Sequence, residues 1–365
     1  MKSLIARLAA TALVAVTFVA SASAEDKVLN IYNWSDYIDS SILTDFTKET
    51  GIKVVYDTFD SNETLETKLL AGGTGYDVVV PSGDFLQRQI QAGVFQKLDK
   101  SKLPNLTNMW DMVQQRISTY DPGNQYAVDY MWGTNGIGFN IDKVKAILGP
   151  DAKPGLEAIF DPKVAAKFKD CGIYVLDAPK DVIPSALTFL GLDPNSTNPA
   201  DFQKVQDLML AVRPYIRKFH SSEYINALAN GDICIAFGYS GDILQARNRA
   251  VDAKNGVNIG YVIPPQGAQM WFDVMAIPAD APHVDAAHQF INYMMRPEVI
   301  AKASDYVFYA DGNKAAQQFI SKDVLDDPSI YPTQDVMQHL FTVSPWDPKT
   351  QRLATRVWQK IVTGQ

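Results

Sequence analysis

The regular alternation of strand-like and helix-like segments near the start of the chain constrains the fold more than any other feature. The expected strands are residues 28–32, 53–56 and 76–80, and the expected helices are 40–51, 63–71 and 85–92. Residues 76–80 are apolar on both faces, as is typical of a strand buried inside a parallel sheet. Glycine follows the first two helices, where a helix commonly ends. This β-α-β-α-β order predicts an α/β fold with a mainly parallel sheet.

The remainder of the chain predicts a second α/β lobe. Further strands are expected at 173–176, 233–237, 260–263 and 274–277, and a helix at 285–295. The glycine-rich run 131–139 is interpreted as a crossover between the lobes, and 365 residues are enough for two domains. The expected first lobe is 25–135 plus about 250–300, and the second is 136–249 plus about 301–365. A ligand cleft is expected between them, with the crossovers acting as hinges.

The first 24 residues have the pattern of a secretory signal peptide. Lys2 and Arg7 form the positive region, residues 8–20 the apolar region, and Ala22–Ala24 the small-residue cleavage site. The apolar stretch is too short for a membrane-spanning helix. We therefore expect a mature chain that starts near Glu25 and is located in the periplasm.

Two cysteines, Cys171 and Cys234, each stand beside a strand-like run. Outside the cytoplasm an even pair is most simply a disulfide. We expect this bond to staple two strands of one sheet.

Three distant segments each place a bulky aromatic residue close to an aspartate. They are Trp34–Tyr37, Tyr239–Asp242 and Trp271–Asp273. Taken singly, each aromatic could be a core residue and each aspartate a surface turn residue. Brought together, they would form a box suited to organic ammonium ions, because aromatic faces attract cations and carboxylates pair with N–H donors. Residues 34–37 and 82–85 both follow expected strands, where ligands of parallel sheets bind.

The sequence offers little support for catalysis. The four histidines, at 220, 283, 288 and 339, lack metal-binding spacing, and no Walker motif is present. Residues 238–242 differ from a nucleophile elbow, since the second glycine comes one residue early. The net charge of −8 without basic clusters disfavours nucleic-acid binding. We expect no catalytic or metal-binding residues, no cofactor and no nucleic-acid partner.

Several segments spread over the mature length resemble a known family. They are Asn33–Tyr37, Tyr76–Ser82, Leu176–Pro179, Phe219–Ser222, Leu228–Cys234, Phe272–Asp273 and Val307–Tyr309. In these segments the chain resembles the periplasmic polyamine-binding proteins of ABC importers, the PotF, PotD, SpuD and SpuE group. Its closest likeness is to the spermidine-preferring SpuE type.

The resemblance implies a type II periplasmic binding-protein fold, a monomer, a polyamine ligand and the permease subunits of an ABC transporter as partners. It also implies roles for particular residues. Aromatic walls would come from Trp34, Tyr37, Phe85, Tyr239, Trp271 and Tyr309, hydroxyl or backbone contacts from Ser35 and Ser82, and carboxylates from Asp36, Asp84, Asp181, Asp242 and Asp273. Asp84 could instead, or in addition, be the N-cap of the helix that starts at Phe85.

Three positions depart from the putrescine-binding members of that family. Tyr239 stands where they carry tryptophan, Asp181 where they carry glutamate, and Trp271 where they carry phenylalanine and spermidine-type members carry tryptophan. An indole binds cations better than a phenyl ring does, so Trp271 favours the longer, triply charged spermidine. The alternative is that Trp271 only fills the space left by the smaller Tyr239. Lysine and arginine are expected to bind poorly, because the box segments hold no basic residue to receive a carboxylate.

Other functions remain open at this point. A receptor for putrescine or for polyamines in general fits the same box. A secreted hydrolase with paired carboxylates would also suit an acidic, aromatic cleft. A receptor for iron or thiamine is a further alternative, although the box is rich in tryptophan for an iron site.

Overall fold

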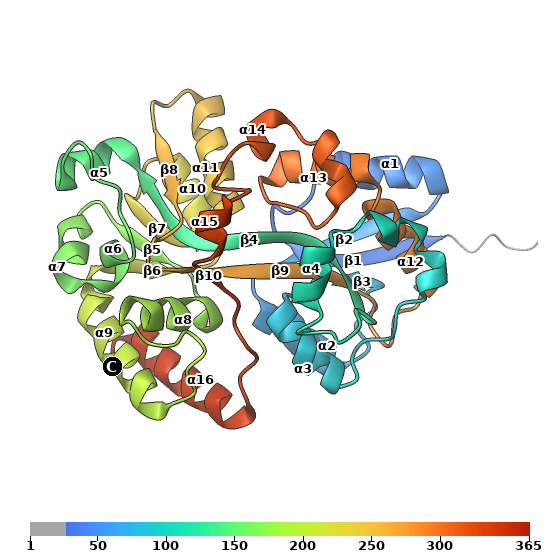
Figure 1. The fold of residues 1–365 in the computed structure, drawn as a ribbon, viewed down its shortest axis with the longest axis horizontal. Helices are drawn as coiled ribbons and strands as arrows, with labels where there is room; N and C mark the ends of the chain where they lie inside the picture. The colour runs from blue at the N-terminus through green and yellow to red at the C-terminus, as the bar shows by residue number, and fades with distance from the viewer. Residues whose placement is uncertain (1–26) are drawn as a thin grey trace, which may run out of the picture.

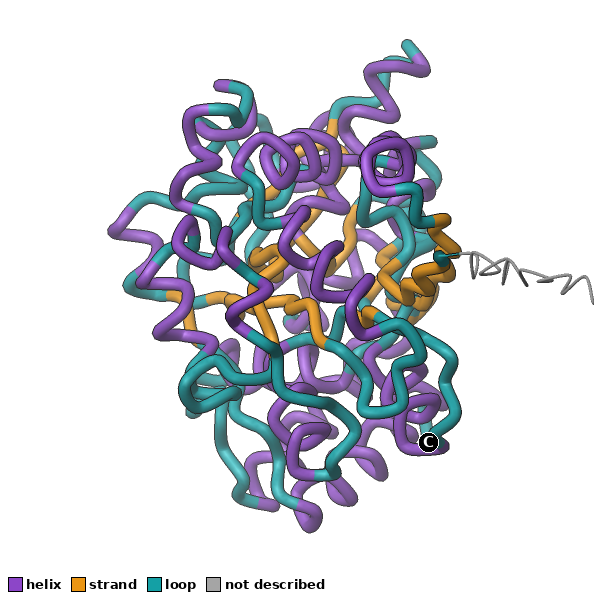
Figure 2. Tube along the Cα trace, turned by 90° about the vertical axis from the view of Figure 1, so that its right-hand side faces the viewer, coloured by secondary structure: helices purple, strands orange, loops and turns teal. Residues whose placement is uncertain are grey.

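A computed structural model describes residues 27–365, so the predicted signal peptide lies outside the described residues. Most strands run through the interior between helices, while some reach the surface (Figure 2). Figure 1 shows two halves of the molecule joined by the long strands β4 and β9, which run across its centre. No helix within residues 27–365 is both long and apolar enough to cross a membrane.

The strands form one connected sheet in the order β2-β1-β3-β9-β4-β7-β5-β6, with β8 paired to β4 and β10 paired to β9. Their bounds are β1 Val28–Trp34, β2 Lys53–Phe59, β3 Val78–Val79, β4 Ala127–Asn140, β5 Ile173–Val175, β6 Ile216–Phe219, β7 Ile235–Tyr239, β8 Ile259–Val262, β9 Ala268–Ala276 and β10 Leu340–Phe341. The outer strands of each half pair in parallel, whereas β4 and β9 pair with each other in antiparallel fashion. The predicted α/β fold with a mainly parallel sheet is confirmed.

Helices cover the sheet. The α-helices are α1 Ser40–Thr50, α2 Asn62–Ala71, α3 Gly83–Gln91, α4 Asp111–Ile117, α5 Ile141–Leu148, α6 Glu157–Phe160, α7 Pro162–Ala165, α8 Pro179–Phe189, α9 Pro199–Val212, α10 Tyr224–Ala229, α11 Ser240–Ala253, α12 Val284–Met294, α13 Pro297–Val307, α14 Lys322–Leu325, α15 Gln334–Met337 and α16 Pro348–Thr363. Short 3-10 helices are η1 Lys100–Lys102, η2 Pro104–Asn108, η3 Ala166–Phe168, η4 Arg213–Tyr215 and η5 Lys314–Gln318.

The ends of the helices follow from local side chains. The carboxylate of Asp39 accepts a hydrogen bond from the backbone N–H of Ser41 at the start of α1, and Gly51 ends that helix with φ of 70°. Asp347 caps α16 in the same way. Pro297 cannot continue the hydrogen-bond ladder of α12, so α12 ends at Met294 and α13 begins at the proline.

Buried side chains form two hydrophobic clusters, one in each half. The first cluster draws on residues 29–132 and 270–330 together with Leu244, and the second on residues 137–259 and 346–361. Two stretches of the chain differ from the expected lobes. Residues 301–330 are expected in the second lobe, but their buried side chains lie in the first cluster, where α13 packs beside α1. Ala250 and Ile259 are expected in the first lobe, but they lie in the second cluster, where β8 pairs with the last residues of β4.

The glycine-rich run 131–139, expected as a crossover, lies within β4, a single buried strand of 14 residues. The first part of β4 pairs with β9, and from Asn135 onward it pairs with β7. The run therefore passes from the first hydrophobic cluster to the second as an extended strand. A glycine-rich sequence can form such a strand where neighbouring groups must approach the backbone closely.

Cys171 and Cys234 form the predicted disulfide, with 5.5 Å between their Cα atoms. They precede β5 and β7, which pair in parallel. The bond therefore ties together two neighbouring strands of the second half.

Candidate ligand-binding site

A pocket lies between the elements of the first and second clusters. Residues at or just after the C-terminal ends of β1 and β3 line one side of the pocket, and residues at the N-terminal ends of α8 and α11 line the other. Every predicted site residue except Asp36 lines it. The lining residues are Trp34, Ser35, Tyr37, Phe59, Asp60, Ser61, Asn62, Glu63, Ser82, Asp84, Phe85, Ala178, Lys180, Asp181, Ser221, Ser222, Ile225, Tyr239, Asp242, Gln269, Trp271, Asp273 and Tyr309.

Asp36 is the exception, and its expected role as an amine partner is not supported. Its carboxylate lies 2.8 Å from the guanidinium of Arg249 on α11, and both side chains are partly exposed. The backbone of Asp36 has φ of 57°, which turns the chain after Ser35. The amide of Gln245 also donates to the Asp36 carbonyl, at 3.3 Å. Asp36 thus links the two halves beside the pocket instead of lining it.

Three aspartates in the pocket share one arrangement: each accepts hydrogen bonds from two neutral side chains. The donors are Tyr37 (2.9 Å) and Ser82 (2.5 Å) to Asp273, Tyr224 (2.7 Å) and Tyr309 (2.8 Å) to Asp242, and Asn135 (2.8 Å) and Tyr239 (3.2 Å) to Asp181. Within residues 27–365, no lysine, arginine or histidine nitrogen lies within 4.0 Å of these three carboxylates. Neutral donors orient the carboxylates but leave their charge uncompensated.

The surroundings make these carboxylates expensive to ionise. Burial raises the pKa of Asp181 and of Asp273 to about 7, and that of Asp242 to about 6. The pKa of Asp273 is raised further by the nearby charges of Asp181 and Asp84. A bound cation would offset this cost, because an opposite charge favours the ionised form. The arrangement can therefore bind a ligand with more than one positive charge.

Aromatic rings form the walls between these carboxylates. The ring of Trp271 lies edge-on to Tyr239 at 5.7 Å and to Tyr309 at 5.1 Å between centroids. Tyr309 lies edge-on to Tyr37 at 5.4 Å. Trp34 is fixed by a hydrogen bond of 2.9 Å from its indole N–H to the carbonyl of Val80. Such rings cover methylene groups and attract cations with their faces.

Gly133 on β4 makes room for this wall. A Cβ atom at Gly133 would lie 2.6 Å from the ring of Trp271 and 2.9 Å from that of Tyr309. No side chain fits there without displacing one of the two rings. The glycine-rich part of β4 thus serves the pocket as well as the connection between the halves.

Asp84 and Phe85 line the pocket from α3, and the proposed N-cap role of Asp84 is wrong. The helix begins at Gly83 with Ser82 as its N-cap residue, so Asp84 lies within the first turn. Its carboxylate lies 3.6 Å from the ammonium of Lys180 on α8. The guanidinium of Arg88 lies 3.9 Å from the Phe85 ring centroid.

Several residues that line the pocket or position its side chains were not predicted from the sequence. Asn62 accepts from the Ser82 backbone and donates to the Ser82 hydroxyl, each at 3.0 Å, and so positions a residue that holds Asp273. Glu63 adds a further acid at the lining, and Gln269 a buried amide. Lys180 is the most consequential omission, because it is a cation in a pocket expected to have none. Its place directly before Asp181, at the start of a helix, was the available signal.

Known proteins resemble this chain along nearly its whole length. Residues 41–333 match the family described as bacterial extracellular solute-binding protein. The putrescine-binding periplasmic protein PotF of Escherichia coli is 53% identical over 100% of this chain and 99% of that protein. The putrescine-binding periplasmic protein SpuD of Pseudomonas aeruginosa is 51% identical over 94% of each. A solved structure of a putative spermidine/putrescine ABC transporter from Listeria monocytogenes matches with a TM-score of 0.81 and 33% identity, over 93% of this chain and 100% of the other.

Proposed function

The chain belongs to the family of bacterial extracellular solute-binding proteins, and from that premise we propose that it is a periplasmic receptor that binds an aliphatic polyamine and delivers it to an ABC importer. The location in the periplasm, expected from the N-terminal segment, is confirmed by the family and by relatives named as periplasmic. The type II binding-protein fold is confirmed by the similar solved structure. At the level of the family, a binding role is supported over catalysis.

One observation carries the proposal: three pocket carboxylates, each held by two neutral donors, that no basic side chain of residues 27–365 neutralises within 4.0 Å. Ammonium groups are the matching ligand chemistry, since a buried charge is tolerated only when paired. The aromatic rings between the carboxylates would cover the methylene segments that separate those ammonium groups. A sugar would leave the carboxylates without counter-charge.

Within the polyamines, the proposed ligand is putrescine. The two most identical relatives described above are both named putrescine-binding, at 53% and 51% identity. The expected preference for spermidine, and the closest likeness to the SpuE type, are not confirmed. The substitutions at Asp181, Tyr239 and Trp271 therefore do not by themselves indicate the longer ligand.

Spermidine remains the second candidate on a specific observation. Asp181, Asp242 and Asp273 offer three unpaired carboxylates, which equals the number of ammonium groups in spermidine. The large face of Trp271 lies among them. A receptor that accepts both amines would use the same three carboxylates.

We expect putrescine and spermidine, but not lysine or glucose, to raise the thermal unfolding temperature of the mature protein. A ligand that binds only the folded state stabilises it by an amount that grows with the logarithm of its concentration divided by its Kd. Lysine should still fail, for a reason other than the one expected from the sequence. The pocket does hold a cation, Lys180, but its ammonium already faces Asp84 and the Ser344 carbonyl, so an α-carboxylate would meet uncompensated acids. Stabilisation by glucose alone would favour the hydrolase alternative.

The affinity for putrescine should rise with pH between 6 and 8. The ammonium groups of the ligand stay charged throughout this range, whereas the raised pKa values of Asp181, Asp242 and Asp273 mean that these carboxyls hold protons near pH 6. Binding must then expel those protons, so the affinity at pH 6 should be at least roughly tenfold lower than at pH 8. Calorimetric titrations in two buffers with different heats of ionisation would count the protons released. An affinity that is constant over this range would contradict the assignment of these carboxylates.

The two halves are proposed to move relative to each other about β4 and β9, closing on the ligand and presenting a surface to the permease subunits. Pairs such as Asp36 with Arg249 join the halves beside the pocket and would form on closure. In hinged closure of this kind, a few residues of the connecting segments take up the change in backbone dihedral angles while each half moves as a rigid body.

A further inference from the structure

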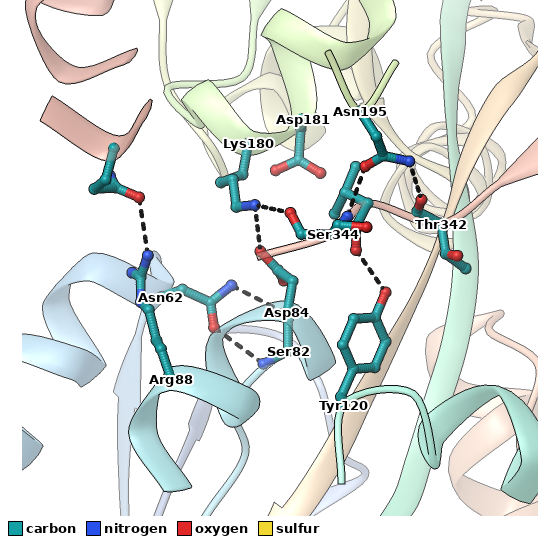
Figure 3. A network of polar contacts seen from close by, with 12 residues as sticks. Asn62, Ser82, Asp84, Arg88, Tyr120, Lys180, Asp181, Asn195, Thr342 and Ser344 are labelled. Atoms are coloured by element: carbon teal, nitrogen blue, oxygen red, sulfur yellow. Dashed lines mark hydrogen bonds and ion pairs between the residues drawn. The ribbon is translucent and has the colours of Figure 1, made fainter. Parts of the chain in front are cut away.

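Lys180 is a buried lysine inside the candidate site. It lies in the first turn of α8, is 4% exposed and lines the pocket beside Asp181. Its ammonium donates to the carbonyl of Ser344 at 2.7 Å and lies 3.6 Å from the carboxylate of Asp84 (Figure 3). It also lies 4.3 Å from the ring centroid of Trp346.

The pair that Lys180 makes with Asp84 joins the two halves of the molecule. Lys180 is on α8, among residues of the second cluster, and Asp84 is on α3, among residues of the first cluster. Figure 3 shows the lysine reaching from its helix toward α3, with Asp181 close by on the same helix. Among the five aspartates that line the pocket, Asp84 differs from the other four in having a basic nitrogen within 4.0 Å in the described part of the chain.

The surroundings of this ammonium are those that a ligand ammonium would require. A carboxylate, a carbonyl oxygen and an aromatic face are the three kinds of group that favour a desolvated cation. Burial lowers the pKa of Lys180, and the charge of Asp84 acts in the opposite sense. The Asp84 Oδ2 atom is buried and accepts no hydrogen bond, so the ion pair is its main compensation. Removal of the lysine would leave a buried carboxylate free to pair with another cation.

We infer that Lys180 is a built-in ammonium group that occupies the subsite at Asp84, and that it thereby limits how many ammonium groups of a polyamine the pocket accepts. The inference rests on the proposed function. Asp181, Asp242 and Asp273 remain for the ligand, and a longer polyamine that reaches Asp84 meets a like charge already in place. Specificity then comes from a repulsive element as well as from attractive contacts.

A purely structural role would have a different signature. If the pair only held the two halves together, its loss would weaken the binding of every ligand by a similar factor. If Lys180 limits the ligand, its loss should favour the tetra-amine spermine over putrescine, because only a ligand with a fourth ammonium group has one left for Asp84 after Asp181, Asp242 and Asp273 are paired. The ratio of the two affinities separates these roles.

The test is calorimetric titration of the wild-type protein and the Lys180→Met variant with putrescine and with spermine. We expect the ratio of spermine affinity to putrescine affinity to rise at least about tenfold in the variant. In the double variant Lys180→Met/Asp84→Asn, the ratio should return toward the wild-type value, since the carboxylate of the subsite is gone. Lys204→Met, which removes an exposed lysine of α9, is the matched control and should leave the ratio unchanged.

A ratio that stays within threefold of wild type in Lys180→Met, while both amines still bind, would overturn the inference and leave the proposed function intact. If the wild-type protein binds neither putrescine nor spermidine, the proposed function fails and the inference fails with it. Should Lys180→Met not fold, Lys180→Gln replaces it. Its amide can still donate toward Ser344 while the positive charge is removed, and the same ratio decides.

Discussion

Replacing Asp273 with asparagine should weaken putrescine binding by at least about 100-fold. A buried charge pair typically loses 2–5 kcal/mol when one partner is truncated, and about 2.7 kcal/mol corresponds to 100-fold. Asp273 is buried and is held by Tyr37 at 2.9 Å and Ser82 at 2.5 Å. Asparagine keeps the shape and can still accept one of these hydrogen bonds, but it leaves a ligand ammonium without a counter-charge. Calorimetric titration at pH 8 measures the loss.

The stability of the ligand-free variant should not fall in parallel. Burial raises the pKa of Asp273 to about 7, so at pH 8 its ionised form is disfavoured in the folded protein relative to the unfolded chain. Removing that charge should leave the unfolding temperature unchanged or higher. Asp285→Asn, at a highly exposed carboxylate paired with Lys102, is the control that should change neither quantity. Putrescine affinity within threefold of wild type in Asp273→Asn would remove this residue from the site.

Removing the disulfide should have the opposite pattern: a large loss of stability with little loss of affinity. Cys171 and Cys234 are separated by 63 residues. In the loop-entropy model, a crosslink of this span destabilises the unfolded chain by about 4 kcal/mol. We expect the double variant Cys171→Ser/Cys234→Ser to lose roughly that amount of unfolding free energy in urea titration.

The affinity of this variant for putrescine should stay within about threefold of wild type, measured well below its unfolding midpoint. Neither cysteine lines the pocket, and the bond joins β5 to β7 away from the aspartates. The reduced wild-type protein is the matched control and should show the same loss of stability. A loss below 1 kcal/mol would mean that the unfolded chain is already constrained in this region.

The local elements of the first half could be predicted from the sequence for simple physical reasons. Short apolar runs, glycine after helices and the alternation of the two patterns place β1, α1, β2 and α2 within a few residues of their bounds. Because β1 and β3 are parallel, the segments that follow them meet at one edge of the sheet. That is why the amino-acid sequence alone predicts that Trp34 and Ser82 belong to one site.

Other features depend on pairings that no local pattern contains. The length of β4 is set by two different partners, β9 and then β7, and its glycines indicate only a crossover until those partners are known. Asp36 was expected in the pocket with its neighbours in sequence, yet Arg249, 213 positions away, holds it outside. The pair of Lys180 and Asp84 is equally non-local. A lysine within a pocket proposed to bind cations also departs from the simple rule of charge complementarity from which the site was predicted.

The most direct measurement is a calorimetric titration of the mature protein with putrescine at pH 8, after bound ligand has been removed by unfolding and refolding. We expect saturable binding of one putrescine per protein, with release of protons when the titration is repeated near pH 6.5. If neither putrescine nor spermidine produces heat with a protein shown to be refolded, the proposed polyamine-binding function is contradicted. The carboxylates of Asp181, Asp242 and Asp273 would then have no cationic ligand.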